Sequence, residues 1–295
     1  MTANGRHIGI LLILISGTAF AIGPTAAKLA LNNGSNTLTV VTLRGAVGAL
    51  LLGLLLVAFR QQFRIGKTAL RWCMLCSAFT AAMVYGLVGS ISYIPVSVAI
   101  LIFFTHPIMI AIIVHWRGGD RLTIRKLILA LAAFSGLALA LAPAIETLQM
   151  RGIALAALAA ITICGAILTG ARAQRYATST QVNLYVTATS SLAFAVITTA
   201  LGAWALPVNT IGWLGIIGAG AGIAVGLLTF FAAFRYLGAV RATMMSNVEP
   251  LLSILFAAAI LGERLQPTQW IGAGVMIGAI VLFEAAEERP VGTQS

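Results

Sequence analysis

The sequence predicts an all-α polytopic membrane protein with ten transmembrane helices, arranged as two inverted repeats of five. Three observations support this. Hydrophobic residues make up 60% of the 295 positions and charged residues only 8%, a composition typical of membrane proteins. The apolar runs are long and lack period-two alternation, which favours helices over a barrel because a helix satisfies its own backbone in lipid. Finally, a shift of 143 residues aligns one half of the chain with the other.

The repeat is ungapped over its clearest stretch. The shift pairs Tyr93 with Tyr236, His106 with Glu249, Pro107 with Pro250, Gly119 with Gly262, Arg121 with Arg264 and Leu122 with Leu265. We therefore expect a single transmembrane domain over residues 1–295, with a first repeat at 1–143 and a second at 144–295.

Ten apolar segments are long enough to cross a bilayer, which takes roughly 20 helical residues. They cover residues 8–31, 39–59, 70–91, 95–116, 124–142, 152–171, 182–203, 211–234, 240–261 and 268–285. The connections between them are short, so no separate soluble domain is expected.

Lysine and arginine are distributed unequally between the two sides of the membrane. With the N-terminus inside, 14 lie on the inner side, and only Lys28, Arg44, Arg151 and Arg264 lie on the outer side. Because basic residues concentrate in cytoplasmic loops, both termini are predicted to be cytoplasmic. Five spans per repeat is an odd number, so the second repeat is expected to be inverted, as in many secondary transporters.

The ninth segment carries a carboxylate, Glu249, near its centre, followed by Pro250. Such a carboxylate costs about 2.5 kcal/mol or more to insert, which makes it a functional candidate. Thr243, Ser246 and Asn247 share one helical face beside it, and the proline frees the Ser246 carbonyl from the helix ladder. Glu249 could bind a substrate ammonium, carry a coupling proton or pair with an internal cation.

His106 occupies the equivalent place in the fourth segment, after Thr105 and before Pro107. Histidine titrates near neutral pH, so His106 could handle protons together with Glu249. The alternative is a hydrogen-bonded histidine in the helix packing. Pro24, Pro107 and Pro250 are the candidate hinges, since proline weakens a helix.

Two cations near the outer ends of the first two segments are also candidates. Lys28 and Arg44 could receive a substrate carboxylate, or could extend to the outer headgroups. Phe79 and Phe103, near mid-depth, are predicted to form part of a cavity wall.

No metal or cofactor is expected. No histidine, cysteine or acidic grouping has metal-ligand spacing, and no glycine-rich nucleotide loop is present, which argues against an ATP-driven pump or an ATPase subunit. The net charge of +11 comes mostly from residues between apolar runs, so it indicates topology rather than nucleic-acid binding.

Glycines at 218, 222 and 226, and at 274 and 278, recur every four residues and predict close helix packing.

Each half ends with a mid-helix proline followed by Gly119-Asp120-Arg121-Leu122 or Gly262-Glu263-Arg264-Leu265. In this pattern and in its ten spans the chain resembles the EamA type of the drug/metabolite transporter superfamily, and most of all the YddG-type exporters of aromatic and other amino acids. The resemblance implies a basket of helices around a central cavity and export of amino acids or related metabolites across the bacterial inner membrane.

The function predicted is a monomeric secondary transporter or facilitator, working by alternating access on a small amphipathic solute in the lipid bilayer. One alternative is a proton-coupled drug or cationic-metabolite antiporter of the same fold. A second, an intramembrane enzyme, would need convergent nucleophile and base residues, and the sequence offers none beyond His106 and Glu249. No enzymatic activity is expected.

Overall fold

The computed structural model describes residues 3–106, 109–110, 113, 124–141, 149–237, 249–262 and 266–285. Within these residues it contains ten helices. They are α1 (Ala3–Asn32), α2 (Thr37–Ala58), α3 (Lys67–Ser90), α4 (Val96–Phe103), α6 (Ile124–Leu141), α7 (Met150–Ala173), α8 (Ser179–Ala200), α9 (Thr210–Leu237), α11 (Glu249–Leu261) and α12 (Pro267–Ala285).

The prediction of an all-helical membrane protein is confirmed. Six of the described helices are long and apolar enough to cross a bilayer: Gly5–Asn32, Thr37–Ala58, Lys67–Ser90, Met150–Ala173, Ser179–Ala200 and Thr210–Phe230. A total of ten spans and the inverted orientation of the repeats stay predictions.

The fourth expected segment, 95–116, is interrupted. Helix α4 ends at Phe103 after eight residues. Residue 107 is a proline and has no N–H to donate to the Phe103 carbonyl. Two side chains lie against the last carbonyls of the helix: Thr105 Oγ1 donates to the Ile102 carbonyl at 2.8 Å, and His106 Nδ1 lies 2.9 Å from the Phe103 carbonyl oxygen.

The two halves contact each other reciprocally. Helix α1 packs along α9 and against α11, while α7 packs along α3 and against α4. The shift of 143 residues relates α1 to α7 and α3 to α9. The contact of α1 with α9 in one pair is therefore equivalent to the contact of α7 with α3 in the other. A Cβ built on Gly9 would meet Tyr236 Cβ at 2.9 Å, and one built on the equivalent Gly152 would meet Tyr93 Cβ at 3.0 Å.

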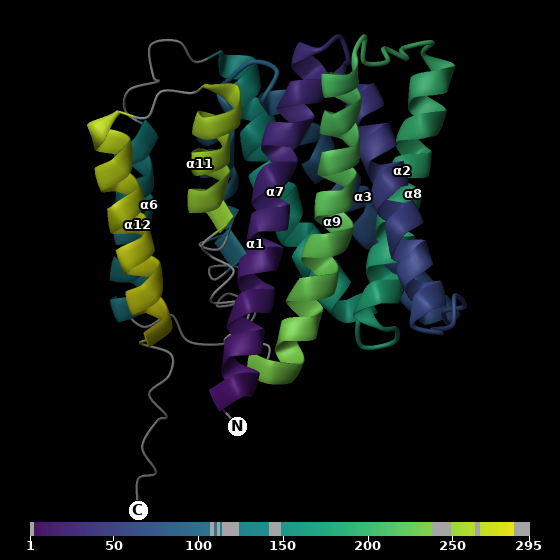
Figure 1. Ribbon diagram of the computed structural model, residues 1–295. Coiled ribbons are helices and arrows are strands. Elements are labelled where there is room, and N and C mark those ends of the chain that lie inside the picture. Colours follow the sequence, from purple (N-terminus) through teal and green to yellow (C-terminus); the bar gives the residue numbers. More distant parts are fainter. Residues whose placement is uncertain are drawn as a thin grey trace, which may run out of the picture.

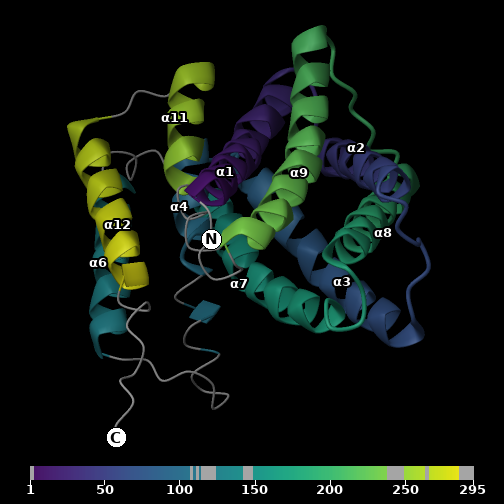
Figure 2. The ribbon, with the colours of Figure 1, turned by 60° about the horizontal axis from the view of Figure 1, so that its bottom comes forward.

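Figures 1 and 2 show the arrangement of the helices from two directions. Helices α6 and α12 lie side by side at one edge of the molecule, where they pack mainly on each other. Helices α1, α9, α2, α8, α3 and α7 form a ring in Figure 2, with α2 beside α8. The cavity described below is lined by side chains of this ring together with α4 and α11.

Large apolar side chains cover the outside of the molecule. Leu50, Leu54 and Val57 share one face of α2 and are 64%, 55% and 61% exposed, respectively. The buried residues of α2 include the small or polar Thr42 and Gly48 together with the large apolar Leu52 and Leu56. Large apolar groups on the outer surface are expected for helices solvated by lipid, and small residues in the interior allow the close packing that holds such helices together.

One end of the bundle is closed by packing. Val40, Val41, Val88, Ile91 and Ile100 belong to a buried cluster near the end at which α1 stops and α2 begins. Hydrogen bonds also join the two halves there. The Val208 N–H donates to the Asn33 carbonyl at 3.0 Å, Asn209 Nδ2 donates to Asn33 Oδ1 at 2.7 Å, and Asn36 Nδ2 donates to the Ala203 carbonyl at 2.6 Å.

The glycine stripe of α9 is closely packed as predicted, and the structure shows that its partner is α1. A Cβ on Gly222 would collide with the Ala19 carbonyl, and one on Gly226 would meet the Phe20 ring at 2.6 Å. The stripe of α12 differs, because a Cβ on Gly274 or Gly278 would meet nothing within 4 Å. Close approach on α12 occurs instead at its backbone, where a Cβ on Gly136 of α6 would lie 2.7 Å from the Gly272 carbonyl oxygen.

Gly215→Ala should destabilise the protein, because the new Cβ would lie 2.5 Å from the Ala26 carbonyl oxygen and the backbone of α1 would have to move. We expect a loss of about 1–3 kcal/mol, as for other overpacked interiors, seen as a lower thermal unfolding midpoint in detergent. Gly274→Ala is the matched control and should unfold at or slightly above the wild-type temperature, since alanine favours a helix. Equal midpoints for both variants would contradict the packing described for α1 and α9.

Candidate functional site

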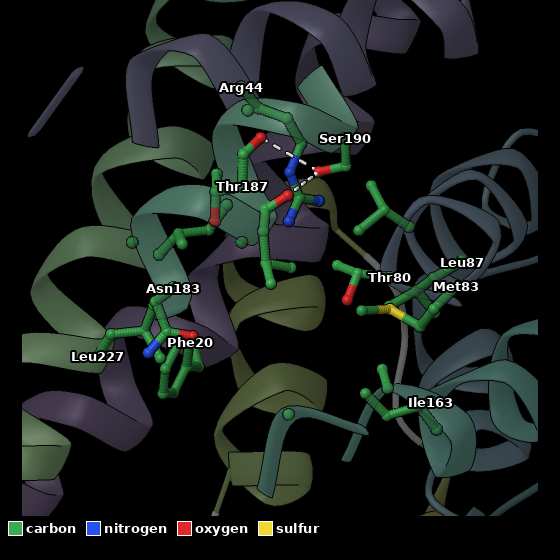
Figure 3. Close-up of a pocket in the computed structure, with 18 of the residues that line it drawn as sticks. Phe20, Arg44, Thr80, Met83, Leu87, Ile163, Asn183, Thr187, Ser190 and Leu227 are labelled. Carbon is green, nitrogen blue, oxygen red and sulfur yellow. Dashed lines mark hydrogen bonds between the residues drawn. The ribbon is translucent and has the colours of Figure 1, made fainter. Parts of the chain in front are cut away.

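A cavity of about 640 Å³ lies between the two halves of the protein. Its walls come from α1, α2, α3 and α4 in the first half and α7, α8, α9 and α11 in the second. The volume lies in the range of small-molecule sites, which are mostly apolar with a few polar groups. Apolar residues such as Phe20, Met83 and Leu227 provide most of this wall, and Figure 3 shows them around the open space.

Equivalent positions of the two repeats line this cavity. Eight pairs of lining residues are related by the shift of 143: Phe20 with Ile163, Gly23 with Ala166, Pro24 with Ile167, Arg44 with Thr187, Cys76 with Ala219, Thr80 with Ile223, Val84 with Leu227 and Leu87 with Phe230. The cavity is therefore a product of the internal duplication, and it lies where the two halves meet.

Two charged residues of the cavity wall have no charged equivalent in the lining contributed by the other repeat. Arg44 and Glu249 are the only charged residues among the described ones that line the cavity. The position equivalent to Arg44 is the neutral Thr187, and the position equivalent to Glu249 is His106, which is not part of the lining. One cationic and one anionic group thus enter the same apolar space, each from a different half.

Close helix packing fixes the backbone around Arg44. A Cβ on Gly45 would meet Ser191 Cβ at 2.9 Å, and a Cβ on Gly220 would lie 2.7 Å from the Arg44 carbonyl oxygen. The Ser191 hydroxyl also donates to the Thr42 carbonyl at 2.8 Å. Helix α2 is consequently held against α8 and α9 at the level of Arg44, with the guanidinium reaching into the cavity (Figure 3).

Helix α8 contributes a polar stripe that was not predicted from the sequence. Asn183, Thr187 and Ser190 are spaced by four and three residues, so they share a helical face, and all three line the cavity. The Ser190 hydroxyl lies 2.8 Å from the Val186 carbonyl oxygen and 3.1 Å from that of Thr187. The spacing could have indicated a cavity-lining face in the sequence. However, serine and threonine residues that only bond to carbonyls of their own helix can show the same spacing.

The cavity reaches the surface near the connection between α7 and α8. Gln174, the residue after the end of α7, is exposed and lines the cavity. At the opposite end the lining includes Val41 and Ile100, which belong to the buried cluster described above. The cavity is thus accessible from the end of the molecule that carries the start of α8 and closed at the other.

The structure brings together four of the residues predicted for the site. Arg44, Phe103, Glu249 and Pro24 all line the cavity. Thr243, Ser246, Asn247 and Pro107 lie outside the described residues, and Pro250 is described only as the second residue of α11.

Four other predicted residues lie elsewhere. Phe79 packs on α7, where a Cβ on Gly165 would meet its ring at 2.6 Å, and it is not part of the cavity lining. Thr105 and His106 bond to carbonyls of their own turn. Lys28 Nζ donates to the Ile91 carbonyl at the end of α3 and borders a separate pocket of about 350 Å³.

The sequence matches the EamA-like transporter family twice, over residues 7–142 and 150–284. The chain belongs to this family. It is therefore a multi-pass membrane protein of a transporter family, built from two EamA repeats, and the resemblance inferred from the sequence is confirmed at this level.

Comparison with solved structures supports the fold alone. A crystal structure of another protein superimposes with a TM-score of 0.67 at 15% identity, covering 96% of this chain and 98% of the other. The comparison with curated proteins gives no match. Among the described residues, no group of three or more histidine, cysteine or acidic side chains could hold a metal ion.

The different placements of the two phenylalanines separate their expected roles. Phe103→Ala should change the affinity for the transported solute several-fold, because it removes part of the cavity wall. Phe79→Ala should leave that affinity unchanged and instead lower the free energy of unfolding by about 3 kcal/mol, the typical cost of emptying a packed aromatic site. Transport kinetics and thermal unfolding in detergent, measured for both variants, check this; the reverse pattern would contradict the cavity wall described here.

Proposed function

We propose that this EamA-family protein is a secondary transporter or facilitator that exports amino acids, aromatic or other apolar ones above all, and related small metabolites. The observation that carries the proposal is the pair of opposite charges in the cavity. Arg44 and Glu249 enter one largely apolar space of about 640 Å³. A zwitterion with an apolar side chain matches such a wall, since its carboxylate suits the guanidinium and its ammonium suits the carboxylate.

Transport would proceed by alternating access. The cavity is closed at one end by the buried cluster and by hydrogen bonds between the halves, and is accessible at the other. Rocking of one half against the other would close the present opening and loosen the far end. Pro24, Pro107 and Pro250 are the proposed hinges, and Pro24 lies in the cavity wall within α1.

Ten spans in two inverted repeats fit this mechanism. The reciprocal contacts of α1 with α9 and α7 with α3, together with the eight pairs of equivalent lining positions, support such an internal symmetry. The site then lies at the repeat interface, as in many secondary transporters. The proposal includes function as a monomer in the bacterial inner membrane, with both termini cytoplasmic, and a YddG-type activity.

Uptake of radiolabelled amino acids into proteoliposomes, with and without an imposed pH gradient, tests the proposal. The wild type should transport an apolar amino acid, and Glu249→Gln should reduce that transport at least about tenfold, because it removes the carboxylate expected to bind the ammonium group. Glu287→Gln, near the end of the chain, is the matched control and should transport normally.

Other outcomes would redirect or contradict the proposal. Unchanged turnover in both Glu249→Gln and Phe103→Ala would contradict it. Gradient-driven efflux of lipophilic cations without amino-acid transport would favour the antiporter instead. Dependence of amino-acid transport on the gradient in the wild type, lost in Glu249→Gln, would make Glu249 the coupling residue.

A further inference from the structure

Arg44 is a half-buried cation without a compensating anion in the described part of the protein. Its Nε atom is buried and has no hydrogen-bond partner there. No salt bridge joins its guanidinium to Glu249, although both line the cavity. Arginine cannot escape this situation by losing its charge, because the guanidinium stays protonated in proteins.

The position of Arg44 also disfavours extension to the membrane surface. It lies seven residues into α2, which places its Cα about 10 Å along the helix axis from the first residue. The side chain points into the cavity (Figure 3). Between Arg44 and the start of α2 lie Val40 and Val41, which belong to the buried cluster.

A second polar group in the same cavity lacks a partner and is also a donor. Asn183 Nδ2 is buried without a hydrogen bond to any described residue. By contrast, the Ser190 hydroxyl, which lies beside the guanidinium in Figure 3, has two carbonyl acceptors in its own helix. The two unpaired groups that belong to described residues of the cavity wall, Arg44 Nε and Asn183 Nδ2, are both donors and need an acceptor, which a bound anion would provide.

We propose that Arg44 is the carboxylate-binding residue of this cavity, that Asn183 assists it, and that the solutes recognised are amphipathic monocarboxylates whether or not they carry an amino group. This rests on the proposal that the cavity is the solute site, and it makes the carboxylate the principal recognition element. An arginine in a low-dielectric site binds a carboxylate through paired, charge-assisted hydrogen bonds. The apolar wall then accommodates the remainder of the solute.

Three ligands that differ in one group each provide the test: phenylalanine, 3-phenylpropanoate, which lacks the amine, and 2-phenylethylamine, which lacks the carboxylate. Binding to purified protein in detergent is measured by isothermal titration calorimetry. The wild type should bind the first two and reject the amine. Arg44→Gln should weaken binding of both carboxylates by about 10- to 100-fold, the effect of removing a charge-assisted hydrogen bond, and Asn183→Ala should weaken it less.

Matched variants separate recognition from structure. Arg44→Lys should recover part of the affinity, and Glu249→Gln should weaken the binding of phenylalanine more than that of 3-phenylpropanoate. Arg64→Gln, at an exposed position between α2 and α3, should change nothing. Arg44→Gln should unfold at or above the wild-type temperature, because it removes a half-buried charge that has no compensating anion among the described residues.

Several results would overturn the inference. They are binding of 2-phenylethylamine as tight as that of 3-phenylpropanoate, unchanged affinity in Arg44→Gln, or marked destabilisation of both Arg44→Gln and Arg44→Lys, which would make the residue structural. If amino acids are transported but Arg44→Gln binds them normally, the inference fails and the proposed function stands. If carboxylates bind through Arg44 but amino acids are not transported, the proposed function fails and the inference stands.

Discussion

The cost of holding a guanidinium inside a membrane protein is the constraint on which the central site depends. A charge in a low-dielectric interior must be paired, solvated or matched by a ligand. Arg44 reaches a cavity with apolar walls, and its Nε has no partner among the described residues. The packing of α2 against α8 and α9, through Gly45, Gly48 and Gly220, keeps it there. Close contacts at these glycines thus hold the Arg44 guanidinium in the cavity, away from the lipid-facing surface.

Duplication supplies the cavity, and divergence supplies its chemistry. Equivalent residues of the two halves line the same space, and the helix contacts exchange between the halves. At the level of the charged residues the halves differ, since Arg44 corresponds to Thr187 and Glu249 to His106. The cavity walls are related by the repeat, but the positive and negative groups are not, so the two ends of a bound solute would meet different charges. The site could therefore orient a solute that has two different polar ends and an apolar body.

Much of the fold could be predicted from the sequence, because long apolar runs indicate membrane helices and the ungapped repeat indicates two equivalent halves. The boundaries of α2 and α8 follow from this pattern, and so does the close packing of the α9 glycines, but not the identity of α1 as their partner. The early end of α4 was not predicted. It is accompanied by contacts of Thr105 and His106 with the carbonyls of their own turn, next to a proline.

Individual site residues were harder to predict than helices. Periodicity shows which residues share a face of a helix, but not whether that face contacts another helix or the cavity. Phe79 and Phe103 both lie near mid-depth in the sequence, yet only Phe103 borders the cavity, while Phe79 fills the space left by Gly165. Asn183 was not singled out because polar residues on α8 are common and most bond within the helix. His106 was chosen by symmetry with Glu249, and its Nδ1 lies within hydrogen-bonding distance of a carbonyl in its own turn.

Protection of a cavity cysteine by solute tests the central claim most directly, that solute occupies the space between the halves. The variant carries Ile163→Cys, in the cavity wall (Figure 3), with Cys73, Cys76 and Cys164 replaced by alanine. Its rate of reaction with a methanethiosulfonate reagent is measured as the concentration of an apolar amino acid rises. Tyr176→Cys, at a position 58% exposed between α7 and α8, is the control in the same background. The account predicts slower modification of residue 163 alone as solute saturates. Equal rates at residue 163 with and without saturating solute would contradict it.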